Sequence, residues 1–93
     1  MPDAVRLHAT VSGFVQGVNF RYYTLGQAQN LGVRGYVRNC EDGTVEVVAE
    51  GERSVVDRLL AWLHAGPPSA YVEKVDYAWE DAQGEFRQFE VRF

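Results

Sequence analysis

The sequence predicts an α+β fold in which two helices cover one face of an antiparallel sheet. Three observations lead to this class. Apolar and polar residues alternate near both ends of the chain, as in half-buried strands. Two segments have the apolar spacing of helices, and an Asp-Gly pair between two strand-like segments marks a hairpin. Together these features give the element order β-α-β-β-α-β.

The first half of the chain contains a strand followed by a helix. Four apolar residues alternate with polar ones and predict the first strand: Val5, Leu7, Ala9 and Val11. A helix is predicted from about Asn19 to Leu31, and Gly32 is well placed as its left-handed C-terminal cap.

The middle of the chain reads as a hairpin. Strands are predicted over Val33–Asn39 and Thr44–Glu50, and Asp42-Gly43 is a strong turn signal between them.

A second helix follows the hairpin. Ser54 is the expected N-cap, with Asp57 three residues later in a capping-box relation. Gly66-Pro67-Pro68 ends the helix. The apolar stripe that should face the sheet consists of Val56, Leu59, Leu60 and Leu63.

The last predicted elements are strands. One covers Val72–Trp79, and a short one is marked by the alternation of Phe89, Val91 and Phe93. With this possible extra strand, the order is that of a ferredoxin-like sandwich. That fold hosts many functions, so the function has to come from individual residues.

The composition fits one compact domain over residues 1–93, because 46% of the residues are hydrophobic. No apolar run approaches the ~18 residues of a membrane span. The N-terminus lacks the apolar core of a signal peptide, so we expect a cytoplasmic protein. The net charge of -4 argues against nucleic acid but allows one focused positive pocket.

The most informative segment is the glycine-bounded stretch from Gly13 to Arg21, where a strand leads into a helix. Such a turn points backbone N–H groups at one spot, and the helix dipole adds partial positive charge there. Arg21 lies in the first helical turn, where a positive charge interacts unfavourably with that dipole and costs ~0.3–1 kcal/mol. A bound anion would satisfy both the amides and the guanidinium. From the pattern alone, an anion site and an ordinary strand-to-helix turn both remain open.

The residues around this loop restrict the chemistry. No Lys-Ser/Thr pair follows it, so it is not a Walker P-loop, and Val15 stands where a cysteine phosphatase loop would need its thiol. The loop offers no nucleophile, and no His or carboxylate cluster accompanies it, so neither a metal nor a cofactor is expected. The single cysteine, Cys40, cannot form an intramolecular disulfide, and no role is expected for it.

Asn39 closes the second strand just before the Asp-Gly turn. It could be a turn residue that bonds its own backbone, or a neutral donor and acceptor that holds a water molecule. Both readings stay open at this point.

Two motifs together resemble the acylphosphatase family. They are Gly13-x-Val15-Gln16-Gly17-Val18-x-Phe20-Arg21 and Gly35-x-Val37-Arg38-Asn39-x-x-Asp42-Gly43-x-Val45-Glu46. The likeness continues through Gly66-Pro67-Pro68 and Val72-x-Lys74-Val75, so it covers nearly the whole chain.

The resemblance implies a small cytosolic enzyme that hydrolyses acyl phosphates to a carboxylate and inorganic phosphate. It implies that Arg21 binds the phosphoryl group and that Asn39 positions the attacking water. The amides that would cradle the phosphoryl group belong to Val15, Gln16, Gly17, Val18, Asn19 and Phe20. Neither a metal nor a covalent intermediate is implied. The expected ligands are an acyl phosphate, phosphate or sulfate, and the expected state is a monomer without nucleic-acid or membrane partners.

Phe14 and Tyr71 depart from the family, because many relatives carry a basic residue at these positions. Both departures would lower the positive charge near the site or on the surface, which puts steering and substrate preference in doubt.

Other functions remain possible on the same fold. One is a non-catalytic small-molecule, regulatory or RNA-recognition module. Another is the acylphosphatase-like domain of hydrogenase maturation factors, which acts on carbamoyl phosphate and heads much larger chains.

Overall fold

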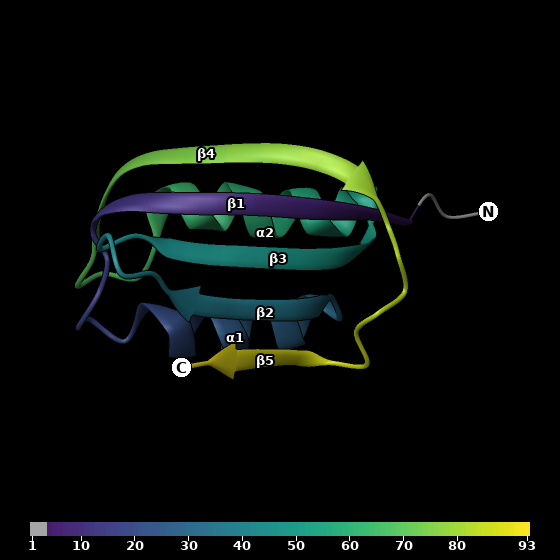
Figure 1. Ribbon diagram of the computed structural model, residues 1–93, viewed down its shortest axis with the longest axis horizontal. Helices are drawn as coiled ribbons and strands as arrows, with labels where there is room; N and C mark the ends of the chain where they lie inside the picture. The colour runs from purple at the N-terminus through teal and green to yellow at the C-terminus, as the bar shows by residue number, and fades with distance from the viewer. Residues whose placement is uncertain (1–3) are drawn as a thin grey trace.

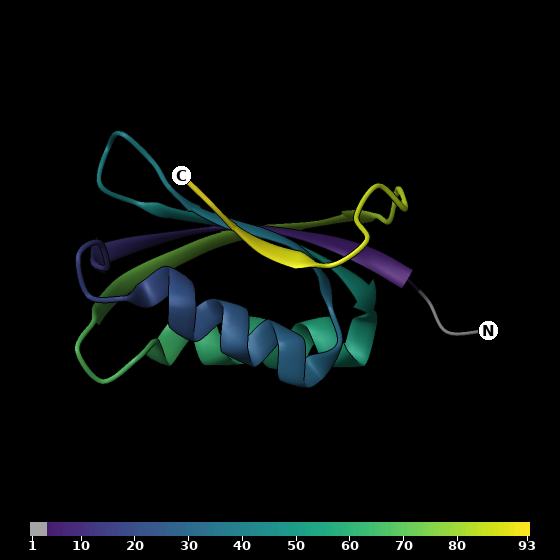
Figure 2. The ribbon, with the colours of Figure 1, turned by 90° about the horizontal axis from the view of Figure 1, so that it is seen from below.

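The computed structural model of the protein describes residues 4–93 and shows a five-stranded sheet with two helices on one face (Figures 1 and 2). Residues 1–3, part of the N-terminal segment considered above, lie outside the described residues. The elements in chain order are β1 (Ala4–Phe14), α1 (Phe20–Leu31), β2 (Arg34–Asn39), β3 (Val45–Glu52), α2 (Arg53–Ala65), β4 (Tyr71–Asp81) and β5 (Phe89–Arg92). The predicted ferredoxin-like fold is thereby confirmed.

The strands lie in the order β4-β1-β3-β2-β5. The neighbouring pairs β4–β1, β1–β3 and β3–β2 are antiparallel, as expected, whereas β5 pairs parallel with β2. The connection over 82–88 runs past the end of the sheet to the opposite edge and reverses the chain direction (Figure 1). Therefore β5 runs opposite to β4 and in the same direction as β2, and the whole sheet is mixed.

The core lies between the sheet and the helices, and the predicted apolar stripes form it. The four stripe residues of α2 are all buried, as are Leu7, Ala9 and Val11 of β1, whereas Val5 is partly buried. Phe20 at the start of α1 is 2% exposed and packs against Trp62 with ring centroids 5.8 Å apart. Among residues 4–93, no helix is long and apolar enough to cross a membrane.

The ends of α1 follow local rules. Gly32 adopts the predicted left-handed C-cap with φ 73°, and its N–H bonds the carbonyl of Gln29. Asn19, at the N-terminal end, is also left-handed with φ 61°. It is the one non-glycine residue among 4–93 with positive φ, so the entry into α1 is backbone that few residues adopt.

The predicted start of α2 was wrong. The helix begins at Arg53, with Glu52 in the N-cap position and no side-chain cap. Ser54 instead lies in the first turn, where its hydroxyl donates to Glu52 Oε1 at 3.1 Å. The reason is that β3 continues to Glu52 and passes into α2 without a loop.

Phe93 also differs from its prediction, because β5 ends at Arg92 and the Phe93 side chain is 93% exposed.

Candidate active site

The structure brings Arg21 and Asn39 to the same cavity. This cavity, with a volume of about 140 Å³, lies where the loop between β1 and α1 meets the end of β2. It is lined by Val15, Gly17, Asn19, Phe20, Arg21, Tyr22 and Asn39. Five of the residues predicted for the site therefore line one cavity together with Asn39, although Asn39 comes from a different part of the chain.

The loop backbone has free hydrogen-bond donors. Within residues 4–93, no carbonyl or side chain accepts from the N–H groups of residues 15–19. Phe20 is the first residue of α1, so its N–H lacks an intrahelical partner. Left-handed conformations at Gly17 and Asn19 turn the chain between these amides. Such a run of unpaired N–H groups at a helix N-terminus can bind an anion.

Gly13 explains how the loop can leave the sheet so close to β4. Its φ is 129°, and a Cβ at this position would lie 2.2 Å from the carbonyl oxygen of Tyr71. The register between β1 and β4 shifts at Ser12/Gly13. Only glycine permits this approach, so the backbone geometry explains why the first residue of the motif is glycine.

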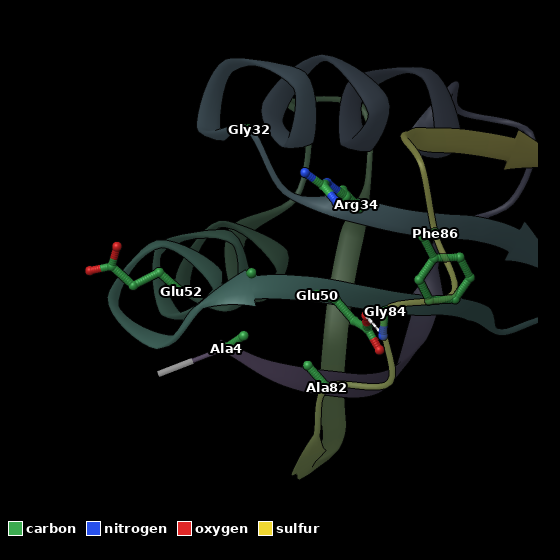
Figure 3. Close-up of a pocket in the computed structure, with 9 residues that line it drawn as sticks. Ala4, Gly32, Arg34, Glu50, Glu52, Ala82, Gly84 and Phe86 are labelled. Atoms are coloured by element: carbon green, nitrogen blue, oxygen red, sulfur yellow. Dashed lines mark hydrogen bonds between the residues drawn. The ribbon is translucent and has the colours of Figure 1, made fainter. Parts of the chain in front are cut away.

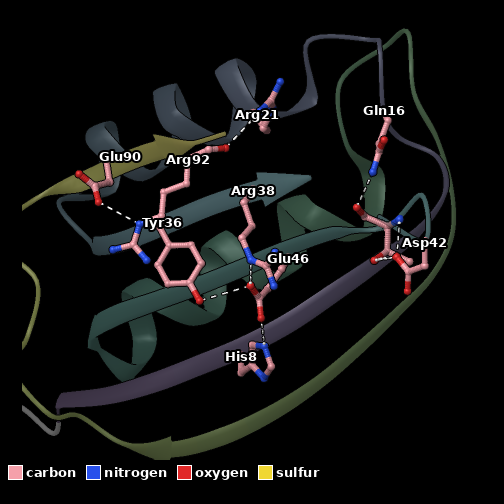
Figure 4. A network of polar contacts seen from close by, with 10 residues as sticks. His8, Gln16, Arg21, Tyr36, Arg38, Asp42, Glu46, Glu90 and Arg92 are labelled. Atoms are coloured by element: carbon pink, nitrogen blue, oxygen red, sulfur yellow. Dashed lines mark hydrogen bonds and ion pairs between the residues drawn. The ribbon is translucent and has the colours of Figure 1, made fainter. Parts of the chain in front are cut away.

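Arg21 is held by the C-terminal end of β5. Its Nη1 donates to the carbonyl of Arg92 at 3.1 Å (Figure 4). Its guanidinium lies 4.6 Å from the ring centroid of Phe93. Among residues 4–93, no carboxylate lies within 4.0 Å of this guanidinium. Arg21 therefore keeps most of its donors and its charge available.

Asn39 is the last residue of β2 and is half-buried. Its side chain makes no hydrogen bond to any residue of the described chain, and the turn that follows is closed by other groups. Asp42 accepts hydrogen bonds from the backbone N–H and hydroxyl of Thr44, which lower the pKa of Asp42. Asn39 is thus not needed to shape this turn.

The side chain of Gln16 makes contacts that the sequence analysis did not predict. Its side-chain Nε2 donates to the carbonyl oxygens of Cys40 at 2.7 Å and Thr44 at 2.9 Å. Figure 4 shows the side chain reaching from the loop toward the hairpin. The loop is also held from the other side, because the Ser69 hydroxyl donates to the carbonyl of Val18 at 3.0 Å. No pattern in the sequence indicates these contacts, because their partners are far apart along the chain.

A second polar cluster lies on the open face of the sheet. Glu46 accepts from His8 Nε2 at 2.7 Å, from the Tyr36 hydroxyl at 3.3 Å, and from Arg38 (Figure 4). Burial alone would raise the pKa of Glu46, but the hydrogen bonds from His8 and Arg38 outweigh it and leave that pKa below its usual value. The Glu46 carboxylate is thus already paired within this cluster.

Other predicted features are placed as follows. Phe14 and Tyr71 are neighbours across β1 and β4, and their side chains are 63% and 65% exposed. Cys40 is half-buried and reduced. Among residues 4–93, no three His, Cys, Asp or Glu side chains are grouped in a way that could hold a metal ion.

A larger cavity, of about 340 Å³, lies at the opposite end of the strands, where β1 and β2 begin (Figure 3). Glu50 on its wall is 6% exposed. Its carboxylate accepts from Arg6 Nε at 2.7 Å and from the backbone N–H groups of Gln83 and Gly84 at 2.9 and 3.0 Å. Burial would raise the pKa of Glu50, but these donors together lower it. The Glu50 carboxylate thus holds the connection between β4 and β5 in place, which is a structural role.

Comparison with known proteins places the chain among ferredoxin-like α+β proteins. A solved acylphosphatase structure from Bacillus subtilis superposes with a TM-score of 0.92 at 27% identity, covering 96% of this chain and 99% of that one. One from Coxiella burnetii has a TM-score of 0.90 at 41% identity, covering 97% and 94%.

The sequences give the particular family. An acylphosphatase from Acaryochloris marina is 54% identical over 91 residues, which are 98% of this chain and 97% of the relative. The acylphosphatase family profile matches residues 7–91. The chain belongs to the acylphosphatase family.

Proposed function

We propose that this protein hydrolyses acyl phosphates to a carboxylate and inorganic phosphate. The observation that carries the proposal is the single cavity lined by Arg21, Asn39 and loop residues whose N–H groups have no partner among residues 4–93. Membership of the acylphosphatase family supports the same reaction.

The phosphoryl group binds at the loop. The amides of residues 15–20 and the guanidinium of Arg21 donate to its oxygens, while one Nη1 hydrogen stays on the carbonyl of Arg92. Because a guanidinium has five N–H donors, it can hold both partners at once. These donors also neutralise the charge that develops on the phosphoryl oxygens in the transition state.

The attacking group is water. The side chain of Asn39, which has no partner among residues 4–93, orients the water in line with the bond to the leaving oxygen. The water oxygen bonds to phosphorus, the bond from phosphorus to the acyl oxygen breaks, and the carboxylate leaves with its electron pair. An amide is a poor base, so a phosphoryl oxygen of the substrate accepts the water's proton.

Apart from the substrate itself, this scheme uses only water and groups of the chain. A carboxylate is a stable leaving group, so no general acid is required at the acyl oxygen. The loop supplies no side chain that could form a phosphorylated intermediate.

The proposal includes the wider properties expected from the sequence. Residues 1–93 act as one domain, the protein is a cytoplasmic monomer, and inorganic phosphate or sulfate binds the loop. Nucleic acid and membranes are not partners.

The test is phosphate release from benzoyl phosphate, acetyl phosphate and carbamoyl phosphate, with and without EDTA. We expect turnover that survives EDTA, and hydrolysis in ¹⁸O-labelled water should place the label in phosphate. Turnover of carbamoyl phosphate alone would support the hydrogenase-maturation reading. Phosphate binding without any turnover would support a non-catalytic module and overturn the proposal.

A further inference from the structure

Two tyrosines follow Arg21 on α1 and lie beside the proposed phosphate cavity. Tyr22 and Tyr23 are 59% and 51% exposed. They line, with Asn19, a second hollow of about 370 Å³ on the surface. Asn19 and Tyr22 also line the 140 Å³ cavity that holds Arg21 and Asn39. The two hollows therefore share a wall, and a molecule anchored in the smaller one can extend into the larger one.

The sizes suit the two halves of an acyl phosphate. Small-molecule sites occupy ~300–1,000 Å³, so the inner cavity of about 140 Å³ has room only for a small group such as the phosphoryl. The outer hollow, of about 370 Å³, is shallower and more open to solvent than the inner cavity, so it can receive a group that projects out of that cavity. The acyl group is the part of the substrate left to fill it.

The chemistry of the outer hollow favours one kind of acyl group. Its three lining residues carry no charge, so a second carboxylate on the substrate would find no partner there. Two phenol rings offer flat faces on which a planar group can stack.

We propose that Tyr22 and Tyr23 form an acyl-group subsite that selects aromatic, uncharged acyl phosphates. This inference rests on the proposed function and names its substrate class. Tyr22 has the larger part, because it lines both hollows, and Tyr23 forms the outer wall.

The test compares kcat/KM for benzoyl phosphate with kcat/KM for acetyl phosphate. The wild-type ratio should exceed one, and Tyr22→Ala should lower the ratio about three- to tenfold, as expected for losing one aromatic contact. Tyr22→Phe should restore the ratio, because it keeps the ring. Tyr77→Ala is the matched control, since Tyr77 is also 51% exposed but lies on β4 away from both hollows.

An unchanged ratio in Tyr22→Ala, with both substrates still hydrolysed, would overturn the subsite and leave the proposed function intact. A wild-type protein that hydrolyses neither substrate would overturn both.

The contacts of Gln16 carry a second, independent inference. Its one side-chain nitrogen bonds two carbonyls, Cys40 and Thr44, on the two sides of the β2–β3 turn. Cys40 directly follows Asn39, whose own side chain has no partner among residues 4–93. The Gln16 amide thus ties the phosphate loop to the backbone that carries Asn39.

We infer that Gln16 is a positioning residue that fixes the distance between the loop and Asn39. A water held by Asn39 and a phosphoryl group held by the loop must be aligned, and small misplacements cost much of the rate. The Gln16 side chain acts through Asn39 and makes no contact with substrate.

A double-mutant cycle tests this role. Gln16→Met keeps the length of the side chain and removes both donors, so kcat should fall about tenfold. In the Asn39→Ala background the same change should have little further effect, since the group it positions is gone. Ser69→Ala is the control, because it removes the loop's other tie at Val18 and should act additively with Asn39→Ala.

Full additivity of Gln16→Met and Asn39→Ala in kcat would overturn the positioning role. It would mean that Gln16 only stabilises the loop.

Discussion

The two ends of the sheet use similar groups in opposite ways. At the end where β1 begins, Arg6 and Glu50 are paired at 2.7 Å, and two backbone N–H groups complete the shell of the carboxylate. At the end where β1 finishes, Arg21 has no carboxylate within 4.0 Å among residues 4–93, and the loop amides have no partner there.

This contrast separates structure from function within one small fold. Paired charges hold the chain together, because each neutralises a partner that burial would otherwise penalise. An unpaired cation beside unpaired N–H groups is incomplete until an anion arrives.

The largest expected effect comes from removing the unpaired cation. Arg21→Ala should lower the turnover of acyl phosphates by ~10³–10⁵, as for other charges that stabilise phosphoryl transfer. Arg21→Lys should also fail largely, because a point charge cannot reproduce the two-pronged contact. Steady-state kinetics on folded protein measures both.

Arg6→Ala provides the comparison at the paired end. It should lower stability and leave turnover of the folded protein near wild type. A folded Arg21→Ala protein with more than about a tenth of wild-type turnover would contradict the contrast between the ends.

The next effect concerns the paired end. Glu50→Ala should destabilise the protein by about 2–4 kcal/mol, because it leaves the Nε of Arg6 and two backbone N–H groups without their acceptor, while Arg6 keeps its second partner, Glu85. Denaturant unfolding measures the loss. The folded fraction should retain its turnover, and a loss of kcat in folded Glu50→Ala would show that the two ends are not independent.

Asn39→Ala should reduce kcat by roughly 10² while inhibition by inorganic phosphate stays nearly unchanged. The reason is that its proposed partner is the water and not the phosphoryl group. If phosphate inhibition weakens in parallel with turnover, Asn39 holds the loop and the proposed role is wrong.

Much of the fold follows from local pattern. The alternation in β1, the stripe on α2 and the Gly32 cap each depend on residues close in sequence, and each was predicted correctly. The start of α2 was wrong because the extent of β3 depends on its pairing with β1, where Ala4 lies opposite Glu52. A local capping pattern at Ser54 carries no information about that pairing.

The candidate site divides in the same way. The sequence named Arg21 and Asn39, and pattern alone left both readings of Asn39 open. The fold places Asn39 on the cavity wall, and its role there is a proposal. The bonds of Gln16 span 24 and 28 residues, and those of Glu50 to the β4–β5 connection span 33 and 34. Contacts of this range arise from the tertiary fold and leave no periodic signal.

The pH dependence of stability should reveal the contribution of the Glu50 carboxylate at the paired end. The donors around Glu50 lower the pKa of its carboxyl below the ordinary value of ~4.3. A lowered pKa in the folded state means that this stabilisation is present above about pH 4.3 and is lost as pH falls through the folded-state value. We therefore expect the free energy of unfolding of wild type to exceed that of Glu50→Gln at pH 7, and the difference to become smaller as the pH is lowered to 3. A difference that is constant with pH would show that the Glu50 charge does not contribute.

The smallest expected effect is the stabilisation of the protein when phosphate binds at the loop and Arg21. Phosphate presents tetrahedral oxygens to the amides of residues 15–20 and to Arg21. A ligand that binds only the folded state adds RT ln(1 + [L]/Kd), or about 1.4 kcal/mol at ten times Kd. For a domain of this size that corresponds to a rise in Tm of roughly 5–10 °C. Part of any rise could be a general effect of phosphate on the surface. Arg21→Ala removes the site and keeps that general effect, so the decisive quantity is the wild-type shift minus the Arg21→Ala shift. A difference of zero would mean that the loop is only a turn, and the contrast between the two ends would lose its functional meaning.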